Sequence, residues 1–457
     1  MSRCASTLAA MTNTTGDPRV DAVLADLART DPDLAALARA GFESLTWGQG
    51  LGTVTLHSLA EFLWHGLPVK WMVGLEEKLQ VAAGLAELFT RLELPRYAAL
   101  CAAPVTAEIL TAYENEDEDR TAGFKAYRAA IEATGVEAPN VPGVIEWGSI
   151  MGADEYGAFR EASIALERAI ETGELKPGSA GWRKTTQLVT TRFLNSRRDE
   201  VTGATWVQWI HTERLQQWME TGGRTRKRLA GAIADTLVHP LPPPADADEH
   251  LRPLRWLLNH AAAGAPLTQK NYLARPIVVE GSQRFGWRTG RGLPRSESGV
   301  IELWMLRKLA QQMRLVRRSK HQLLLSTTGK TLYGADTEDM WAATMACLPG
   351  STEAEAAAGE VALLLMLAGE QLDYEAMDIE VAAALAEGGW RDSHTGAPIT
   401  RFGAGNLLGH MLRLVEILHL ATERHWNEPL LLNDAGRAAA HTALRARALR
   451  ARTNPYD

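Results

Sequence analysis

The chain has 457 residues, of which 46% are hydrophobic and 23% charged. This length predicts about three to four domains, and the composition excludes a wholly disordered chain. The three cysteines (Cys4, Cys101 and Cys347) are far apart and show no CxxC spacing, so we expect neither a disulfide framework nor a thiolate metal site. The longest apolar run, residues 361–368, is much shorter than the roughly 20 residues of a membrane span. We therefore expect a cytoplasmic protein with no membrane partner.

The net charge of −7 hides an uneven distribution of charge along the chain. Residues 1–182 carry 14 basic and 26 acidic side chains, and residues 331–457 carry 9 and 18. Between them, residues 183–330 carry 25 basic and 11 acidic side chains, a net charge of +14. Such a block predicts a surface that binds a polyanion. The alternative is that the acidic parts fold onto the basic block and neutralise it.

The chain before residue 250 is expected to be helical throughout. Apolar residues at spacings of three and four predict a helical domain over 17–113 and a second helical segment over 121–182. A basic helical segment follows at 183–239. The proline run of residues 240–244 then marks the clearest expected domain boundary.

The basic segment 183–239 interleaves tryptophans with cations. Trp206, Trp209 and Trp218 could stack on bases of a single strand, but their helical spacing favours a buried core. A cluster of cations follows two glycines and is expected to be exposed. We predict that it contacts phosphates: Arg224, Arg226, Lys227 and Arg228.

Two stretches after the proline run resemble each other in sequence. Gly264, Gly286, Met305, Leu323 and Gly329 correspond to Gly369, Gly389, Met411, Leu430 and Gly436, in the same order. The offsets lie between 103 and 107 residues, so the differences fit into loops. Ordered matches of this kind predict a duplicated domain.

Each copy shows the same pattern of elements. Short helices precede a longer one (302–314 in the first copy and 407–418 in the second), and two short strands joined by a polar turn follow. The strands are expected at 315–318 and 323–326, and at 420–424 and 430–432.

This pattern resembles the winged-helix family, a helix-turn-helix variant that occurs as tandem segments in actinobacterial proteins. The resemblance covers 250–345 and 352–455. It implies two tandem winged-helix-like units with short β-hairpins. Together with the helical patterns before residue 250, the predicted fold is mainly α, with helical N-terminal domains followed by these two units. In that family the helix before the hairpin enters the DNA major groove and the hairpin contacts the backbone.

The first copy is the one whose charge suits nucleic acid, because residues 303–335 contain no Asp or Glu. On the long helix we predict that Arg307 and Lys308 contact phosphates, and that Gln311 and Gln312 reach base edges. On and after the hairpin we predict phosphate contacts from Arg317, Arg318, Lys320 and Lys330.

Two motifs that resemble a phosphate-binding loop and a metal site are incomplete. Residues 326–331 resemble the end of a phosphate-binding P-loop, but Leu324 stands where that loop needs a glycine. Glu416, His419 and Glu423 share a helix face, yet no second Cys or His pair supports a metal site. We therefore predict no catalytic residue, no metal and no cofactor.

The sequence thus predicts a non-enzymatic protein that binds nucleic acid, double-stranded DNA in the first place. A regulatory or mobile-element role suits such a protein. The alternative is a protein-interaction or scaffolding protein, whose winged-helix-like units bind a protein partner or a second copy of the chain.

Overall fold

The computed structural model describes residues 15–114, 121–287, 292–422 and 428–454. It is mainly helical with one small three-stranded sheet, which confirms the expected class. The chain divides into two compact units, the first formed by Met1–Ile210 with Ala451–Asp457 and the second by His211–Arg450. None of the described helices is both long enough and apolar enough to cross a membrane.

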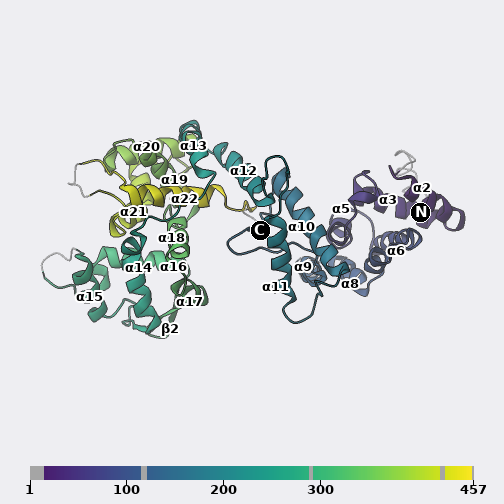
Figure 1. Ribbon diagram of the computed structural model, residues 1–457, viewed down its shortest axis with the longest axis horizontal. Coiled ribbons are helices and arrows are strands. Elements are labelled where there is room, and N and C mark those ends of the chain that lie inside the picture. Colours follow the sequence, from purple (N-terminus) through teal and green to yellow (C-terminus); the bar gives the residue numbers. More distant parts are fainter. Residues whose placement is uncertain (1–14, 115–120, 288–291, 423–427, 455–457) are drawn as a thin grey trace. The chain divides into compact units, whose positions relative to one another are not determined.

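The first unit is built from helices and their connections (Figure 1). They are α2 (Pro18–Thr30), α3 (Pro32–Thr46), η1 (Leu51–Thr53), α4 (Leu56–Glu61), η2 (Phe62–Gly66), α5 (Leu67–Lys70), α6 (Leu75–Arg91), α7 (Pro95–Cys101), α8 (Pro104–Glu114), α9 (Ala122–Thr134), α10 (Ala153–Glu171), α11 (Trp182–Leu194) and the start of α12 (Trp206–Met219).

The main core of the first unit lies between α3 and α6, which approach closely. A Cβ on Gly84 of α6 would lie 3.1 Å from the Ala38 backbone nitrogen of α3. Around this contact Phe42, Leu85 and Phe89 are fully buried. The apolar residues at spacings of three and four, which predicted a helical domain here, thus form its buried face.

The second unit contains the remaining elements. They are α13 (Arg224–Leu237), α14 (Ala247–Ala262), β1 (Ala265–Pro266), α15 (Arg275–Phe285), η3 (Glu297–Gly299), α16 (Ile301–Gln312), β2 (Val316–Ser319), β3 (Gln322–Leu325), α17 (Thr327–Tyr333), α18 (Thr337–Ala346), α19 (Glu353–Leu367), α20 (Tyr374–Glu387), α21 (Arg401–Ile417) and α22 (Asp434–Ala448).

The centre of the second unit is α19, which contacts α13, α20, α21 and α22. Its apolar run is buried on nearly all sides, from Ala356 to Met366. A helix that is apolar all round needs neighbours on every side, so four helices enclose it. The proline run at 240–244 consequently lies inside this unit, since α13 before it packs on α19 and α20. The division between the units falls instead within the predicted segment 183–239.

The sheet has the strand order β1-β3-β2, and both pairs are antiparallel. In β2 and β3, Val316 pairs with Leu325 and Ser319 with Gln322, so the hairpin lies within one residue of its expected position. Where the sequence predicted a second hairpin, at 420–424 and 430–432, the described residues form a bridge between Ala421 and Leu432 instead of two strands. Part of the expected strand 420–424 and its turn lie outside the described residues.

Several backbone features recur at the spacing of the predicted repeat. Gly264 and Gly369, at the ends of α14 and α19, both have φ of 82°. The long helices α16 and α21 are each followed by a left-handed residue, Arg314 and His419, with φ of 54° and 51°. Non-glycine residues rarely adopt this conformation, so its recurrence indicates the same helix-to-strand connection in both places.

The glycines after the strands show the closest agreement. A Cβ on Gly329 would lie 1.9 Å from the Leu315 carbonyl oxygen, and one on Gly436 would lie 1.8 Å from the Leu420 carbonyl oxygen. Each glycine also donates its N–H to the cap of its helix, Ser326 or Asn433. The Gly-Lys that resembles a P-loop is thus explained by a close backbone approach.

We expect Gly329→Ala and Gly436→Ala each to destabilise the second unit by about 3 kcal/mol, because a backbone carbonyl cannot move away from the new methyl group. Gly231→Ala is the control, since Gly231 lies inside α13 with no atom within 4 Å of its Cβ position. It should stabilise by about 0.5–1 kcal/mol. Differential scanning calorimetry measures all three variants, and equal effects of the three would contradict the close approach.

A buried cationic cluster lies between α12 and α22 of the second unit. Arg214 is 4% exposed and donates to the Leu449 carbonyl oxygen at 2.7 Å. Burial, together with the charges of Arg445 and Arg214, lowers the pKa of His211 to about 4. His211 is therefore neutral in the folded protein near pH 7.

Because its folded pKa lies below the unfolded value near 6.5, neutral His211 contributes stability above that value. The contribution is lost as the pH falls toward 4, and amounts to about 3 kcal/mol. We expect His211→Gln to flatten the decline in unfolding free energy between pH 7 and pH 4. The exposed His239, changed to Gln, is the control. Urea denaturation at a series of pH values tests this, and parallel curves for wild type and His211→Gln would refute it.

Candidate nucleic-acid interface

The hairpin of β2 and β3 presents cations at one edge of the sheet. β2 is an edge strand, because β3 lies between it and β1. Val316 and Leu325 face the core and are buried, whereas Arg317 and Arg318 are exposed. Lys320 begins the turn with φ of 51° and is also exposed. The buried residues therefore anchor the hairpin while its charges project into solvent.

Two further cations lie next to this hairpin. Arg314 precedes β2, and Lys330 lies in α17 directly after β3; both are exposed. Within the part of the chain that the structure describes, none of these cations forms an ion pair. We call them the hairpin cations: Arg314, Arg317, Arg318, Lys320 and Lys330. Arg314 was not among the residues predicted from the sequence, although the acid-free stretch includes it.

The long helix α16 exposes fewer of the predicted nucleic-acid-binding side chains than expected. The Gln312 side-chain amide donates to the carbonyl oxygens of Cys347 and Gly350, at 2.9 and 2.8 Å. Lys308 lies 3.3 Å from the Glu355 carboxylate. α16 packs against α21, and His410 Nε2 lies 3.3 Å from the Met305 carbonyl oxygen.

Arg307 also binds groups of the protein itself. Its guanidinium lies 3.0 Å from the Glu297 carboxylate and donates to the Asn271 carbonyl oxygen at 2.8 Å. Glu297 is fully buried. Burial raises the pKa of the Glu297 carboxyl, and the charge of Arg307 opposes that rise. Arg307 and Gln312 therefore make internal contacts, and Gln311 is the one predicted α16 residue that is exposed.

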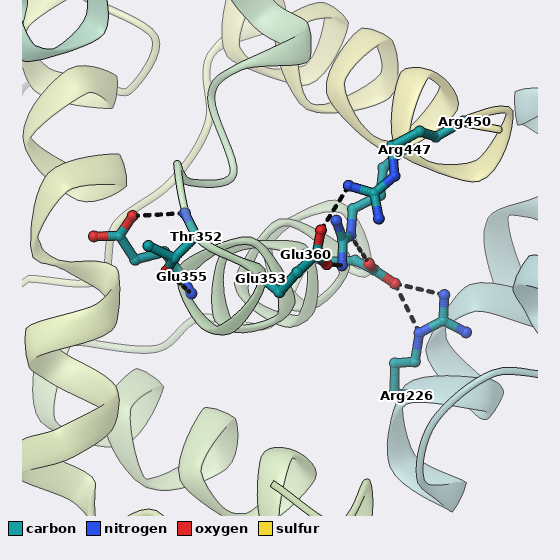
Figure 2. Close-up of polar contacts among 7 residues, drawn as sticks. All are labelled: Arg226, Thr352, Glu353, Glu355, Glu360, Arg447 and Arg450. Carbon is teal, nitrogen blue, oxygen red and sulfur yellow. Dashed lines mark hydrogen bonds and ion pairs between the residues drawn. The ribbon is translucent and has the colours of Figure 1, made fainter. Parts of the chain in front are cut away.

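The cluster at the start of α13 is divided between the interior and the surface. Arg226 is 6% exposed, with its Nε 2.7 Å from Glu360 Oε1 and a further donation to the Trp218 carbonyl oxygen. Figure 2 shows the Glu360 carboxylate between the guanidinium groups of Arg226 and Arg447. Arg226 cannot reach a phosphate in this state. Arg224, Lys227 and Arg228 are exposed.

The two exposed cationic groups do not form one surface. Figure 1 places α13 and β2 at opposite ends of the second unit. One short duplex that contacts the hairpin cations is therefore not expected to reach Arg224, Lys227 and Arg228 as well. The tertiary structure thus separates two groups that the sequence placed in one basic block.

Neither a metal site nor a reactive cysteine is supported by the described residues. No group of three His, Cys, Asp or Glu side chains there could hold a metal ion. Glu416 accepts from the Tyr374 hydroxyl at 2.6 Å, and Glu423 lies outside the described residues. Burial raises the pKa of the Cys101 thiol to about 12 and that of Cys347 in the same direction, so neither is a thiolate near pH 7.

The sequence did not reveal the roles of two carboxylates of α19, Glu355 and Glu360. Although burial raises its pKa, hydrogen bonds from Ser351 and Thr352 and the charge of Lys308 bring the pKa of Glu355 down to about 2. Glu355 is 47 residues from Lys308, and Glu360 is 134 residues from Arg226. No local pattern indicates partners at such separations.

We expect Glu360→Gln to destabilise the second unit by about 3–5 kcal/mol, because Arg226 and Arg447 would remain buried without a carboxylate. Glu353→Gln is the matched control on the same helix, since its side chain is 61% exposed. It should cost about 0–1 kcal/mol. Urea denaturation followed by tryptophan fluorescence compares the two, and similar midpoints would show that Glu360 is not the central partner.

Comparisons of the chain with family models, with curated proteins and with solved structures found no match. The assignment of the interface therefore depends on the geometry and charge of this chain alone.

Proposed function

We propose that this protein binds nucleic acid, double-stranded DNA in the first place, through the β2–β3 hairpin. The observation that carries the proposal is the group of exposed hairpin cations in a stretch without acidic residues. Cations of this kind neutralise phosphates and release counterions, which favours binding in a salt-dependent way.

The order of elements from α14 to β3 supports a winged-helix-like unit. One α-helix, one strand, two α-helices and two strands follow each other, with the short helix η3 between the two α-helices, and the strands form a single sheet. This unit departs from a helix-turn-helix in one respect, because 15 residues, numbers 286–300, separate α15 from α16. We also propose that the recurring left-handed residues and glycines reflect a duplicated unit.

Contacts to the backbone, without base reading, are the mode of binding that suits this geometry. Of the two side chains expected to read bases, Gln312 is bound to the carbonyl oxygens of Cys347 and Gly350, and Gln311 alone is exposed. Phosphate contacts position a protein on DNA but carry no sequence information. The proposed binding is therefore of low sequence specificity.

We expect wild type to bind a random DNA duplex with a log–log salt slope of roughly −3.5 to −4.5, since four to five cations each release about 0.9 counterion. The Arg317→Ala/Arg318→Ala/Lys320→Ala variant should lose affinity and reduce the slope by roughly 2–3. Fluorescence anisotropy at several salt concentrations measures both quantities.

The matched control is Arg224→Ala/Lys227→Ala/Arg228→Ala, which removes the same charge at the other end of the unit. A larger loss for the hairpin variant supports a contact at the hairpin. Equal losses would show that only net charge matters, and no binding by wild type at low salt would overturn the proposal.

A protein-interaction role is the second candidate, and exposed apolar side chains favour it. Ile301 and Trp304 of α16 are 42% and 40% exposed, and Phe402 of α21 is 70% exposed. Arginines on an edge strand also have a purely protective use, because they prevent pairing with other strands. This role predicts no DNA binding and a mass in solution, measured by light scattering, that changes with Trp304→Ala.

A further inference from the structure

A pocket of about 280 Å³ lies in the first unit. It is bordered by the end of α3, the loop after it, the segment from α4 to Trp71, and α10. Its walls combine aromatic rings with charged groups, among them Trp47, Trp71, Lys70 and Arg160. This combination suits a ligand with a planar ring and a negative charge.

Two aromatic groups of the pocket, Trp47 and Tyr156, lie outside the core, whereas Phe62 belongs to it and Trp71 packs against it. Trp47 is 81% exposed and has φ of 53°, a conformation that is unfavourable for a non-glycine residue. Lys70 Nζ lies 5.9 Å from the centre of its ring. Tyr156 on α10 is 54% exposed. Exposed rings held in one place offer faces on which a ligand ring can stack.

The charged groups of the pocket have little to neutralise them. Among the described residues, Arg160 has only a contact of 3.9 Å with the adjacent Glu161, and Lys70 has no ion pair. The Glu61 carboxylate forms no hydrogen bond with the described residues. Burial lowers the pKa of His65, so this side chain is neutral near pH 7. Two cations therefore face one carboxylate in this pocket.

The backbone of the pocket is also unusual. Phe62–Gly66 forms a π-helical turn, in which the Leu67 N–H donates to the Phe62 carbonyl oxygen. Such turns are rare and occur frequently at functional sites. This turn contributes Phe62, His65 and Gly66 to the lining.

We propose that this pocket binds a nucleotide. The base stacks on the tryptophan rings, as bases do on exposed aromatics in single-strand-binding proteins. Arg160 and Lys70 hold the phosphate, since a guanidinium fork and an ammonium group both suit its oxygens. Glu61 accepts a hydrogen bond from an amino group of the base. The nucleotide is either a free mononucleotide or the end of a single strand.

This proposal does not depend on the hairpin, because the pocket belongs to the first unit. The test uses the full chain with the hairpin substitutions Arg317→Ala/Arg318→Ala/Lys320→Ala, so that an oligonucleotide cannot bind there. Isothermal titration calorimetry is run with adenosine monophosphate, adenosine, inorganic phosphate and a short oligodeoxyadenylate carrying a 5′-phosphate. Failure at the pocket and failure at the hairpin are then separate results.

We expect adenosine monophosphate to bind, and Trp47→Ala and Arg160→Ala each to weaken binding by about ten-fold. Both side chains lie at the surface of the pocket, so neither variant should unfold the unit. Met72→Ala and Arg168→Ala are the controls, since both side chains are exposed and lie outside the pocket lining. Adenosine and phosphate alone should bind more weakly than the nucleotide.

Tighter binding of the oligonucleotide than of the mononucleotide would identify a strand end as the ligand, and the reverse order would identify a free nucleotide. Absence of binding by both at millimolar concentration would overturn the proposal. Equal effects of Arg160→Ala and Arg168→Ala would overturn it as well.

Discussion

The second unit depends on the carboxylates of one buried helix, α19. Its apolar faces are enclosed by four helices, and its three glutamates neutralise cations from three other elements. Glu360 holds arginines of α13 and α22, Glu355 holds a lysine of α16, and Glu353 holds the end of α22. Of the three glutamates only Glu360 is buried, and a buried charge must be paired, so its contacts require the arginines of α13 and α22 beside α19. They also determine which cations of the basic block are left at the surface.

This division of charge bears directly on the proposed function. The basic block is neutralised in part, at Arg226, Arg307 and Lys308, and is left exposed at the hairpin. The sequence allowed two interpretations of the basic block, a nucleic-acid surface or a block neutralised inside the fold. Neutralisation inside the fold describes Arg226, Arg307 and Lys308, and an exposed cationic surface describes the hairpin. The packing of α16 against α21 removes most of the helix that would read bases. The exposed hairpin cations suit contact with the phosphate backbone of a nucleic acid. Such contacts position a protein on the duplex but do not read the base sequence.

In the first unit, the feature that bears on function is a tryptophan left outside the core. Its core lies between helices in close contact, and the tryptophans there are not all used for it: Trp64 is buried, whereas Trp47 is held at the surface. The strained backbone at Trp47 and the π-helical turn nearby both cost free energy that the core alone does not require. Such features cluster at functional sites, and they support our proposal of a ligand site in this pocket, which belongs to the other unit than the hairpin.

Local pattern alone was sufficient for much of the structure. The helical class, the buried face around Leu85, the hairpin position and the recurring glycines depend on periodicity and on residue types with special backbone freedom, which are readable in sequence. The acid-free stretch 303–335 was readable for the same reason, because charge can be counted along the chain. Only the tertiary structure decided that Arg226 and Arg307 are internal, and that the two exposed cationic groups lie at opposite ends of their unit. The physical reason is that neutralisation depends on neighbours in space, and Glu360 reaches Arg226 across 134 residues of chain.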